Sequence, residues 1–355
     1  MSVQTGDCVV VIGAGLVGAS IGMALVSAGH QVHLRDQVSS HAKVAASLGA
    51  GTTEKAAPGD VGLAIVAVPP SALAKAILGA LERYPHAVVT DVGSVKGAVL
   101  AELTASGADV SRYVGSHPMA GSQHAGPLTS RPDLFVDRTW VVTPHTSSLP
   151  EAVARVERLA ADCGGRVVVM AAAEHDEAVA QVSHLPQLMS SLTAGRLVDV
   201  PQEHLRLAGQ GIRDVTRIAG SDPDLWQQIV AANAEAVRTE LLAVQDALAG
   251  LVAVLDDPAA VREFIARGRQ GTRALPGKHG QRATDFANVV VEIPDAPGSL
   301  ARLFAEIGEA GVNVEDVTIE HDEAREVGYL WLSVTPDRAP QLATTMRDRG
   351  WSVRQ

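Results

Sequence analysis

The sequence predicts an α/β protein of three parts: a doubly wound Rossmann-like domain, an all-helical dimerisation domain and a ferredoxin-like βαββαβ domain. Short apolar runs alternate with helical patterns over residues 1–170, and helical patterns alone fill residues 171–275. A linker at 276–286 precedes two further strand–helix units at 287–355. Alternating strands and helices predict a mostly parallel sheet. A chain of 355 residues also exceeds what one hydrophobic core usually supports.

Composition and charge narrow the class of protein. The formal net charge of −11 disfavours nucleic acid or an anionic membrane as a partner. Only Cys8 and Cys163 are cysteines, so we expect neither a disulfide framework nor a cysteine metal site. No signal stretch opens the chain, and no apolar run reaches the roughly 18 residues of a membrane helix. None of the histidines has a ligand spacing that indicates a metal. We expect a soluble, cytoplasmic protein.

The first strand–helix–strand unit carries a glycine motif, GAGLVG, directly after the apolar run at residues 8–12. Gly13 permits the tight turn, Gly15 lets the backbone approach a pyrophosphate, and Gly18 lets the helix pack on the strand. The motif therefore predicts dinucleotide binding. The expected cofactor contacts in this loop are Gly13, Gly15, Leu16, Val17 and Gly18.

The second strand of this unit ends at Asp36. A carboxylate at that position accepts hydrogen bonds from the adenosine ribose and repels a 2′-phosphate, which favours NAD over NADP. Arg35 beside it leaves NADP open.

Further candidate residues follow the next strands, predicted at 63–70 and 87–94. Ligands of doubly wound sheets lie beyond the carboxyl ends of the strands, so residues that follow strands share one edge. We expect cofactor contacts from Val68, Pro69 and Asp91, whereas Lys96 either contacts the cofactor or only begins a helix. His117, in GSHPMAGSQHAG after the strand-like SRYVGS, is expected at the same edge, facing the nicotinamide.

The helical middle is predicted to break at Pro186, near Pro201, at Ser221-Asp222-Pro223 and at Asp257-Pro258. Asp222 followed by Pro223 is typical of a helix N-cap and first turn. This segment is too apolar for a free-standing bundle, so we expect a homodimer. From Arg267 to Asp285 the chain is rich in Gly, Arg and Pro, which predicts a linker.

The C-terminal domain has strand patterns at 288–294, 312–321, 327–335 and 351–354, with helical patterns at 295–311 and 339–350. That order is typical of a ferredoxin-like fold.

Taken together, the motifs resemble prephenate dehydrogenase with a C-terminal ACT domain over nearly the whole length. The matching stretches are VIGAGLVGASIGMAL, DVGSVK, GSHPMAGSQHAG, HDEAVAQVSHLP, GIRDVTRIAGSDPDLW and DAPGSLARLFAEIGEAGVNV. The resemblance implies oxidative decarboxylation of prephenate to 4-hydroxyphenylpyruvate, with NAD as the hydride acceptor. It also implies that His117 is the base that takes the proton of the ring hydroxyl, and that Ser94 bonds this hydroxyl and orients His117.

The resemblance also implies how the substrate is held. Arg217 is expected to bind a carboxylate of prephenate, with Arg213 on the same helix face and Trp226 as a wall of the pocket. His175 and His184 match family positions near the pocket and are either structural histidines or substrate contacts. Two departures, Gln187 and Gln123, stand where relatives often have His and Glu. A neutral Gln187 offers no partner to the ammonium of arogenate, which favours prephenate.

In the tail, DAPGSL and GVNV resemble the ligand loop of ACT domains. We expect tyrosine to bind near Asp295, Gly298 and Asn313 and to inhibit, with phenylalanine or a vestigial site as alternatives.

Three other functions stay open. One is arogenate dehydrogenase, and another is a β-hydroxyacid or imine reductase. Such reductases usually use a lysine in the helical middle, and this chain has none between Ala172 and Leu275. The third is a catalytically silent amino-acid sensor, which the intact Ser94, His117 and Arg217 disfavour.

Overall fold

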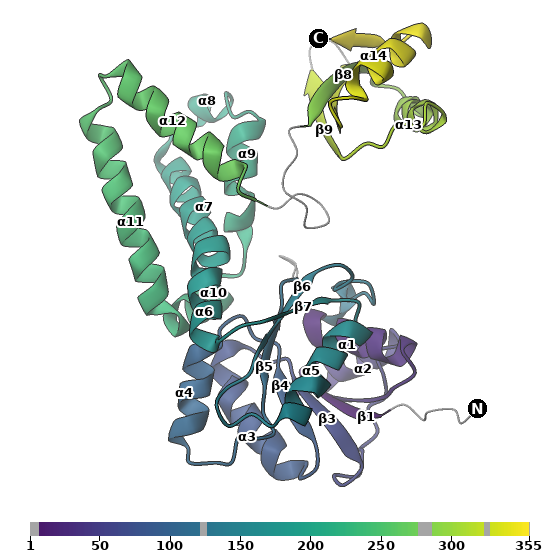
Figure 1. The fold of residues 1–355 in the computed structure, drawn as a ribbon, viewed down its shortest axis with the longest axis vertical. Coiled ribbons are helices and arrows are strands. Elements are labelled where there is room, and N and C mark those ends of the chain that lie inside the picture. The colour runs from purple at the N-terminus through teal and green to yellow at the C-terminus, as the bar shows by residue number, and fades with distance from the viewer. Residues whose placement is uncertain (1–6, 121–125, 276–285, 323–326, 355) are drawn as a thin grey trace. The chain divides into compact units, whose positions relative to one another are not determined.

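The computed structural model describes residues 7–120, 126–275, 286–322 and 327–354 (Figure 1). The chain divides into two compact units, residues 1–249 and 250–355. The linker expected at 276–286 lies outside the described residues except for Phe286.

The first unit begins with a parallel sheet in the order β2-β1-β3-β4. Its strands are β1 Cys8–Ile12, β2 Gln31–Arg35, β3 Val61–Val66 and β4 Val88–Asp91. The chain moves outward from β1 to β2 and then crosses back to β3 on the other side. The ends of β1 and β3 therefore form the switch point at which doubly wound sheets bind their ligands.

A second sheet continues this layer in the order β5-β6-β7, formed by β5 Gly115–Pro118, β6 Thr139–Thr143 and β7 Arg166–Val169. β5 is antiparallel to β6, and β6 is parallel to β7. A single parallel bridge, Val89 to Tyr113, joins β4 to the segment before β5. A side-chain hydrogen bond also joins the two sheets, since Ser116 Oγ of β5 donates to the carbonyl of Asp91 in β4 at 2.8 Å.

Helices cover both faces of the first sheet (Figure 1). Along β1, Val9 and Val11 join one core with α1, α2 and α5, whereas Val10 joins a second core with α3 and α4. This alternation follows the two-residue period of a strand and explains why a strand buried on both faces is apolar throughout. The helices of this part are α1 Leu16–Ser27, α2 Ser39–Ser47, α3 Leu73–Arg83, α4 Gly97–Ala105 and α5 Pro150–Asp162.

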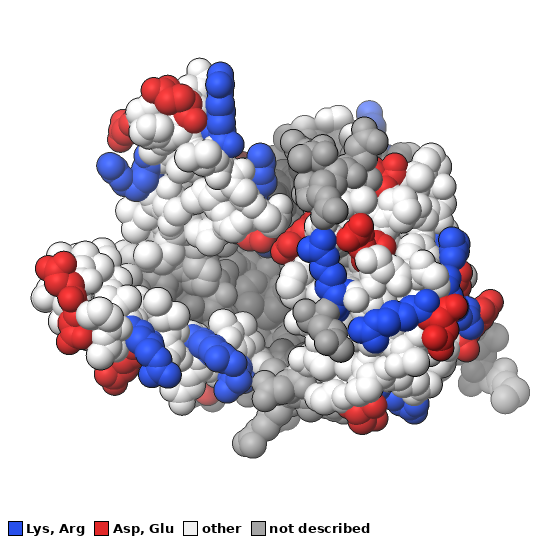
Figure 2. All heavy atoms as spheres, turned by 90° about the horizontal axis from the view of Figure 1, so that it is seen from above, with Lys and Arg blue, Asp and Glu red and all other residues white. Residues whose placement is uncertain are grey.

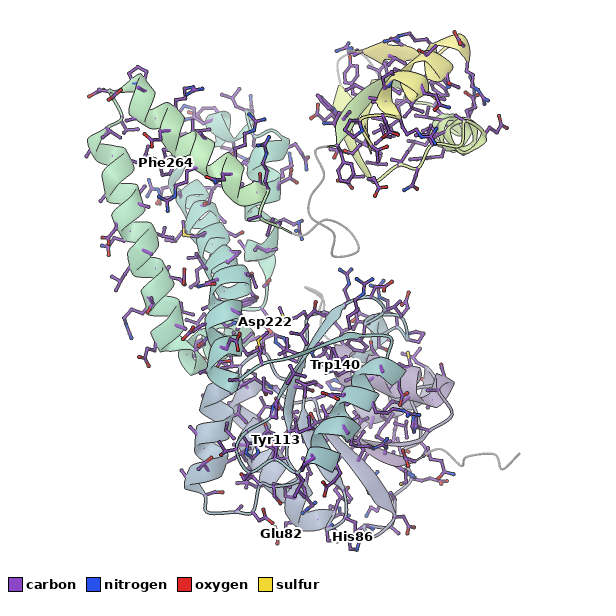
Figure 3. The ribbon with its side chains drawn as sticks, viewed as in Figure 1. Glu82, His86, Tyr113, Trp140, Asp222 and Phe264 are labelled. Carbon is purple, nitrogen blue, oxygen red and sulfur yellow. The ribbon has the colours of Figure 1, made fainter. Side chains whose placement is uncertain are left out.

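Helices then follow one another, as predicted. They are α6 Ala172–Val179, α7 Leu185–Arg196, α8 Gln202–Leu205, α9 Gln210–Thr216, α10 Pro223–Ala232 and α11 Ala234–Ala253, the last crossing into the second unit. Asp222 caps α10 as expected, with its carboxylate accepting from the N–H groups of Asp224 and Leu225 (Figure 3).

The break predicted at Pro186 is wrong. α6 and α7 are joined by a π-helical turn, Ala180–His184, and the backbone stays helical through it. In this turn the N–H of Leu185 bonds to the carbonyl of Ala180, five residues back. The wider turn changes the local bonding ladder where the proline enters, so Pro186 occupies the first turn of α7, where its missing N–H costs little.

The second unit holds α12 Pro258–Thr272 and the C-terminal domain. Because α12 continues to Thr272, the linker does not begin at Arg267 as predicted; the helix is capped at its start by Asp257. The C-terminal sheet has the antiparallel order β11-β8-β10-β9, as expected for the ferredoxin-like fold. Its elements are β8 Ala287–Pro294, α13 Ser299–Glu309, β9 Asp316–Asp322, β10 Val327–Val334, α14 Ala339–Asp348 and β11 Ser352–Arg354.

Two surface features bear on the expected partners. Within the described ranges, every helix is too short or too polar to cross a membrane. On the face drawn in Figure 2, basic side chains are scattered among acidic ones rather than gathered into one field.

Candidate active site

The glycine loop after β1 has the geometry that its sequence predicts. Gly13 has φ +101°, and a Cβ there would lie 2.1 Å from the carbonyl oxygen of Ala67. A Cβ on Gly18 would lie 1.9 Å from the carbonyl oxygen of Gly13, so any side chain would push α1 off the loop. A Cβ on Gly15 would meet nothing within 4 Å. The loop is thus closed toward the protein and open at the start of α1, where N–H groups point to a ligand.

Asp36 is tied to this loop. Its Oδ2 accepts from Ala14 N at 2.7 Å, and its Oδ1 accepts from Val38 N at 2.7 Å. Arg35 is turned away, because its guanidinium donates to the backbone carbonyls of Thr53 and Glu54 at 3.0 and 2.9 Å. The carboxylate therefore stands beside the loop, while the adjacent cation is already engaged elsewhere.

The register of the sheet aligns the expected cofactor residues along one edge. Ile12 pairs with Val66, and Val66 pairs with Asp91, so the loops after β1, β3 and β4 start side by side. Val68 is half-buried and Pro69 exposed in the loop after β3.

Asp91 and Lys96 form a buried ion pair between β4 and the start of α4. The Lys96 ammonium donates to Asp91 Oδ2 and, at 2.8 Å, to the carbonyl of Ser116. The hydroxyl of Tyr113, which lies inside this layer in Figure 3, donates to Asp91 Oδ1 at 2.8 Å. Since the carboxylate is fully buried and bonded within the protein, the cofactor contact expected of Asp91 finds no support. Lys96 likewise points inward and crosses from the first sheet to β5.

His117 lies within β5, near its end, rather than just after a strand as expected. Its Nδ1 is 2.9 Å from Nε2 of His175 in α6, and the two rings meet edge to face with centroids 5.1 Å apart. His175 Nδ1 is in turn 2.8 Å from Oδ1 of Asp176. Residues 58 apart in the chain are thus joined in one hydrogen-bonded row, from His117 through His175 to Asp176.

The surroundings of His117 lower its pKa. Removal from water, with smaller electrostatic contributions from His175, Lys96 and His184, holds the pKa of His117 well below its usual value of 6.5. The imidazole of His117 is therefore neutral at physiological pH. A neutral imidazole at the carboxyl edge of the sheet can accept a proton.

His184, in the π-helical turn, is buried beside the row. Its ring meets Trp226 edge to face with centroids 6.0 Å apart, and its Nδ1 is 3.2 Å from the amide nitrogen of Asn233. Burial lowers its pKa to about 4, against a raising effect of Asp176. Gln187, one turn along α7, is also buried.

Arg213, Arg217 and Ser94 are also expected at the site. α9 ends at Thr216, so Arg217 begins a 3-10 turn, Arg217–Gly220, and does not share a regular helix with Arg213 as predicted. Both arginines are exposed, and the turn of Arg217 packs against α7. Ser94 is half-buried in the bend before α4, and in the described part of the chain the ring of His117 is held by His175 instead. Gln123 lies outside the described residues.

Sequence reasoning missed Asp176 and Asn233. The Asp176 carboxylate accepts from the N–H groups of Lys96 and Gly97 at 2.9 and 2.7 Å, and Asn233 donates to the Asp176 carbonyl at 2.8 Å. The dipeptide His175-Asp176 was the available signal, since an acid next to a histidine can bond its ring. Among the residues described, no cluster of His, Cys, Asp and Glu is arranged to hold a metal ion.

In the C-terminal domain, the three expected regulatory residues lie in two loops. Asp295 and Gly298 separate β8 from α13, and Asn313 lies between α13 and β9. Gly298 has φ +89° and directly precedes α13, and Asn313 donates to Glu315 at 2.6 Å. All three are exposed.

Comparisons with known proteins agree with this architecture. Residues 21–169 match the nucleotide-binding domain of prephenate dehydrogenase, residues 171–260 its dimerization domain, and residues 287–348 the ACT domain. A probable prephenate dehydrogenase, NovF, of Streptomyces niveus is 36% identical over 96% of this chain and 98% of its own length. Prephenate dehydrogenase of Lactococcus lactis is 25% identical over 94% and 95% of the two chains.

Among solved structures, prephenate dehydrogenase of A. aeolicus in complex with hydroxyphenyl propionate and NAD+ is 27% identical, with a TM-score of 0.67. The match covers 76% of this chain and 98% of that one. With the relative from Streptomyces niveus matching nearly end to end, the chain belongs to the prephenate dehydrogenase family.

Proposed function

We propose that this chain is an NAD-dependent prephenate dehydrogenase, which converts prephenate to 4-hydroxyphenylpyruvate with release of carbon dioxide. The observation that carries the proposal is the half-buried His117, which is hydrogen-bonded to His175 at the carboxyl edge of a nucleotide-binding sheet. On the resemblance of its motif, His117 is the group proposed to take the proton of the ring hydroxyl. A positioned base of this kind typically contributes about 10²–10⁴-fold to the rate.

The nucleotide loop fits the dinucleotide. The open side of Gly15 leaves room for a pyrophosphate at the start of α1, and the carboxylate of Asp36 would accept from the adenosine ribose. NAD is favoured over NADP because Asp36 would repel a 2′-phosphate, while Arg35 is already bonded to backbone carbonyls. When bound, NAD supplies the electron-pair acceptor of the oxidation.

Substrate binding rests on charge. Prephenate carries two carboxylates, and Arg217 is the proposed partner of one of them, a task suited to its planar fork. Arg213, Trp226 and His184 are proposed to complete the pocket. The buried side chain of Gln187 is neutral, which favours the keto group of prephenate over the ammonium of arogenate. Loss of carbon dioxide makes the ring aromatic, so positioning matters more than a strong acid.

The remaining parts are proposed to assemble and regulate the enzyme. The helices matched by the dimerization model would pair two copies, and the C-terminal domain would bind tyrosine near Asp295, Gly298 and Asn313. We further propose a cytoplasmic location, by analogy with small-molecule biosynthetic enzymes.

The test is the initial rate of NADH or NADPH formation with prephenate and with arogenate, each with NAD and with NADP. We expect fast turnover of prephenate with NAD, reduced 10²–10⁴-fold in His117→Asn. His86→Asn is the matched control, because His86 is exposed at the opposite edge of the sheet (Figure 3). A higher rate with arogenate than with prephenate would make arogenate the substrate. Absence of turnover on both by folded protein would contradict the enzyme and favour an amino-acid sensor.

A further inference from the structure

The hydrogen bonds of the row from His117 to Asp176 have a donor-to-acceptor direction. This direction decides which nitrogen of His117 carries no hydrogen. We infer that His175 and Asp176 are positioning residues that hold His117 in the tautomer protonated on Nδ1, so that the lone pair of Nε2 receives the substrate proton. The inference rests on the proposed role of His117 as the base. It assigns a function to His175, which the motif resemblance leaves as either a structural histidine or a substrate contact, and to the neighbouring Asp176.

The direction begins at Asp176. Three donors converge on its carboxylate: the N–H groups of Lys96 and Gly97, at 2.9 and 2.7 Å, and the ring of His175, at 2.8 Å. Backbone N–H groups can only donate, and an ionised carboxylate can only accept. Nδ1 of His175 must therefore carry the hydrogen of the third bond.

The next bond follows from the first. A neutral imidazole has one N–H, so a His175 that donates through Nδ1 has a bare Nε2. This Nε2 is 2.9 Å from Nδ1 of His117, and it can take part in a hydrogen bond only as the acceptor. Nδ1 of His117 must then carry its hydrogen, which leaves Nε2 of His117 as the unprotonated nitrogen.

Besides β5, the row is anchored on α6, on α4 and on the residue between α10 and α11. Asp176 and His175 belong to α6, and the Asp176 carboxylate bonds to the first N–H groups of α4, where a negative charge is favoured by the helix dipole. A Cβ on Gly97 would lie 2.8 Å from Asp176 Oδ2, so the approach depends on this glycine. Asn233, before α11, donates to the carbonyl of Asp176 at 2.8 Å.

The charged and titratable groups around His117 agree with this arrangement. His175 faces it from α6, with Asp176 bonded to the other nitrogen of the His175 ring; His184 acts on it from the π-helical turn, and Lys96 from the start of α4. Lys96 is itself paired with Asp91 of β4, so Asp176 is the carboxylate in hydrogen-bonded line with His117.

The proton balance is simple. The O–H bond of the hydroxyl on the substrate ring breaks, and an N–H bond forms at His117 Nε2. The side chain of His117 thereby becomes an imidazolium. Its Nδ1–H keeps its bond to His175, and the Asp176 carboxylate at the end of the row offsets the new charge without taking the proton.

The first test needs no substrate. In protein labelled with ¹⁵N-histidine, the ring nitrogen shifts at neutral pH distinguish an Nδ1–H from an Nε2–H tautomer, and the His117 signals are those missing from His117→Asn. We expect His117 in the Nδ1–H form, and a change of that form in His175→Asn. His86→Gln is the control that should leave the His117 signals unchanged. An Nε2–H tautomer of His117 in the wild type would overturn the inference.

A matched pair of variants gives the kinetic test. In His175→Gln the side-chain amide reaches the place of Nε2 and can still accept from His117, whereas the shorter side chain of His175→Asn keeps only a donor to Asp176. We expect kcat to fall about 10²-fold in His175→Asn and less than tenfold in His175→Gln, with KM within about twofold in both.

The two proposals fail separately. If the tautomer is as expected but neither prephenate nor arogenate is turned over, the proposed function fails, and only the assignment of the His117 tautomer to His175 and Asp176 stands. If turnover is fast and His117 carries its hydrogen on Nε2, the inference fails alone. Equal losses of kcat in the two His175 variants, with an unchanged His117 tautomer, would make His175 a merely structural residue.

Discussion

Single residues show where sequence patterns carry physical meaning. Gly13 and Gly18 are required because a Cβ at either would collide with backbone oxygen, whereas Gly15 has open space around it. Asp36 fits its predicted place, but it also bonds to the N–H groups of Ala14 and Val38. The same carboxylate thus shapes the loop and is proposed to select the cofactor.

We expect Asp36→Asn to raise KM for NAD about tenfold, because a charged hydrogen bond worth roughly 1.5–3 kcal/mol is weakened. KM for NADP should fall, because the charge that repels a 2′-phosphate is lost. The measurement is kcat/KM for both cofactors. Arg35→Ala is the matched control and should keep the wild-type preference, since its guanidinium bonds to the carbonyls of Thr53 and Glu54. An unchanged cofactor ratio in Asp36→Asn would remove Asp36 from cofactor selection.

At the scale of elements, the π-helical turn Ala180–His184 is the feature that sequence patterns did not reveal. Proline inside a helical pattern usually marks a break, and the sequence therefore predicts one at Pro186. The turn adds one residue to the helix, so α6 and α7 remain continuous and Pro186 enters within the first turn of α7. His184 of this turn is thereby buried against Trp226 and Asn233.

The buried His184 should make stability depend on pH. Its pKa is about 4 in the folded protein and about 6.5 when unfolded, so the unfolded chain binds more protons between these values and stability falls as the pH falls through them. Between pH 7 and pH 5 the loss from this residue is about 2 kcal/mol. The free energy of unfolding, measured with urea at pH 7 and at pH 5, should differ between the two pH values by about that much less in His184→Gln than in the wild type. The exposed His86→Gln should behave as the wild type. Equal differences in all three proteins would show that His184 is not linked to folding.

At the scale of the whole molecule, the chain joins a nucleotide-binding half and a helical part to a small antiparallel domain. The first unit has two cores on the faces of its sheet, and the C-terminal domain has a separate core. A domain with its own core can respond to a ligand of its own. Tyrosine is therefore proposed to act through the C-terminal domain and to alter the activity of the first unit.

We expect tyrosine to raise the melting temperature and to lower kcat/KM of the full chain. A ligand at a hundred times its Kd stabilises the folded state by about 2.7 kcal/mol, which thermal unfolding detects readily. Asn313→Ala should lose both effects, whereas Asn288→Ala, an exposed asparagine of β8 in the same domain, should keep them. If tyrosine leaves both activity and melting temperature unchanged, the regulatory role fails. A response to phenylalanine but not to tyrosine would make phenylalanine the effector.

The sequence by itself determined the order of the elements, the nucleotide loop and the family resemblance. These depend on local periodicity and on glycines whose φ or close contacts admit no side chain, and neighbours along the chain carry that information. His117 could be selected for the same reason, since its motif is continuous.

Only the tertiary structure decided what surrounds His117. Its bond to His175 joins residues 58 apart, and Lys96 and Gly97 meet Asp176 across 80 and 79 residues. Asp91 was expected to contact the cofactor and is instead paired with Lys96 inside the protein. Burial, pKa and the direction of a hydrogen bond depend on groups that folding brings together, so a pattern of neighbouring residues could suggest His175-Asp176 but not the row that they form.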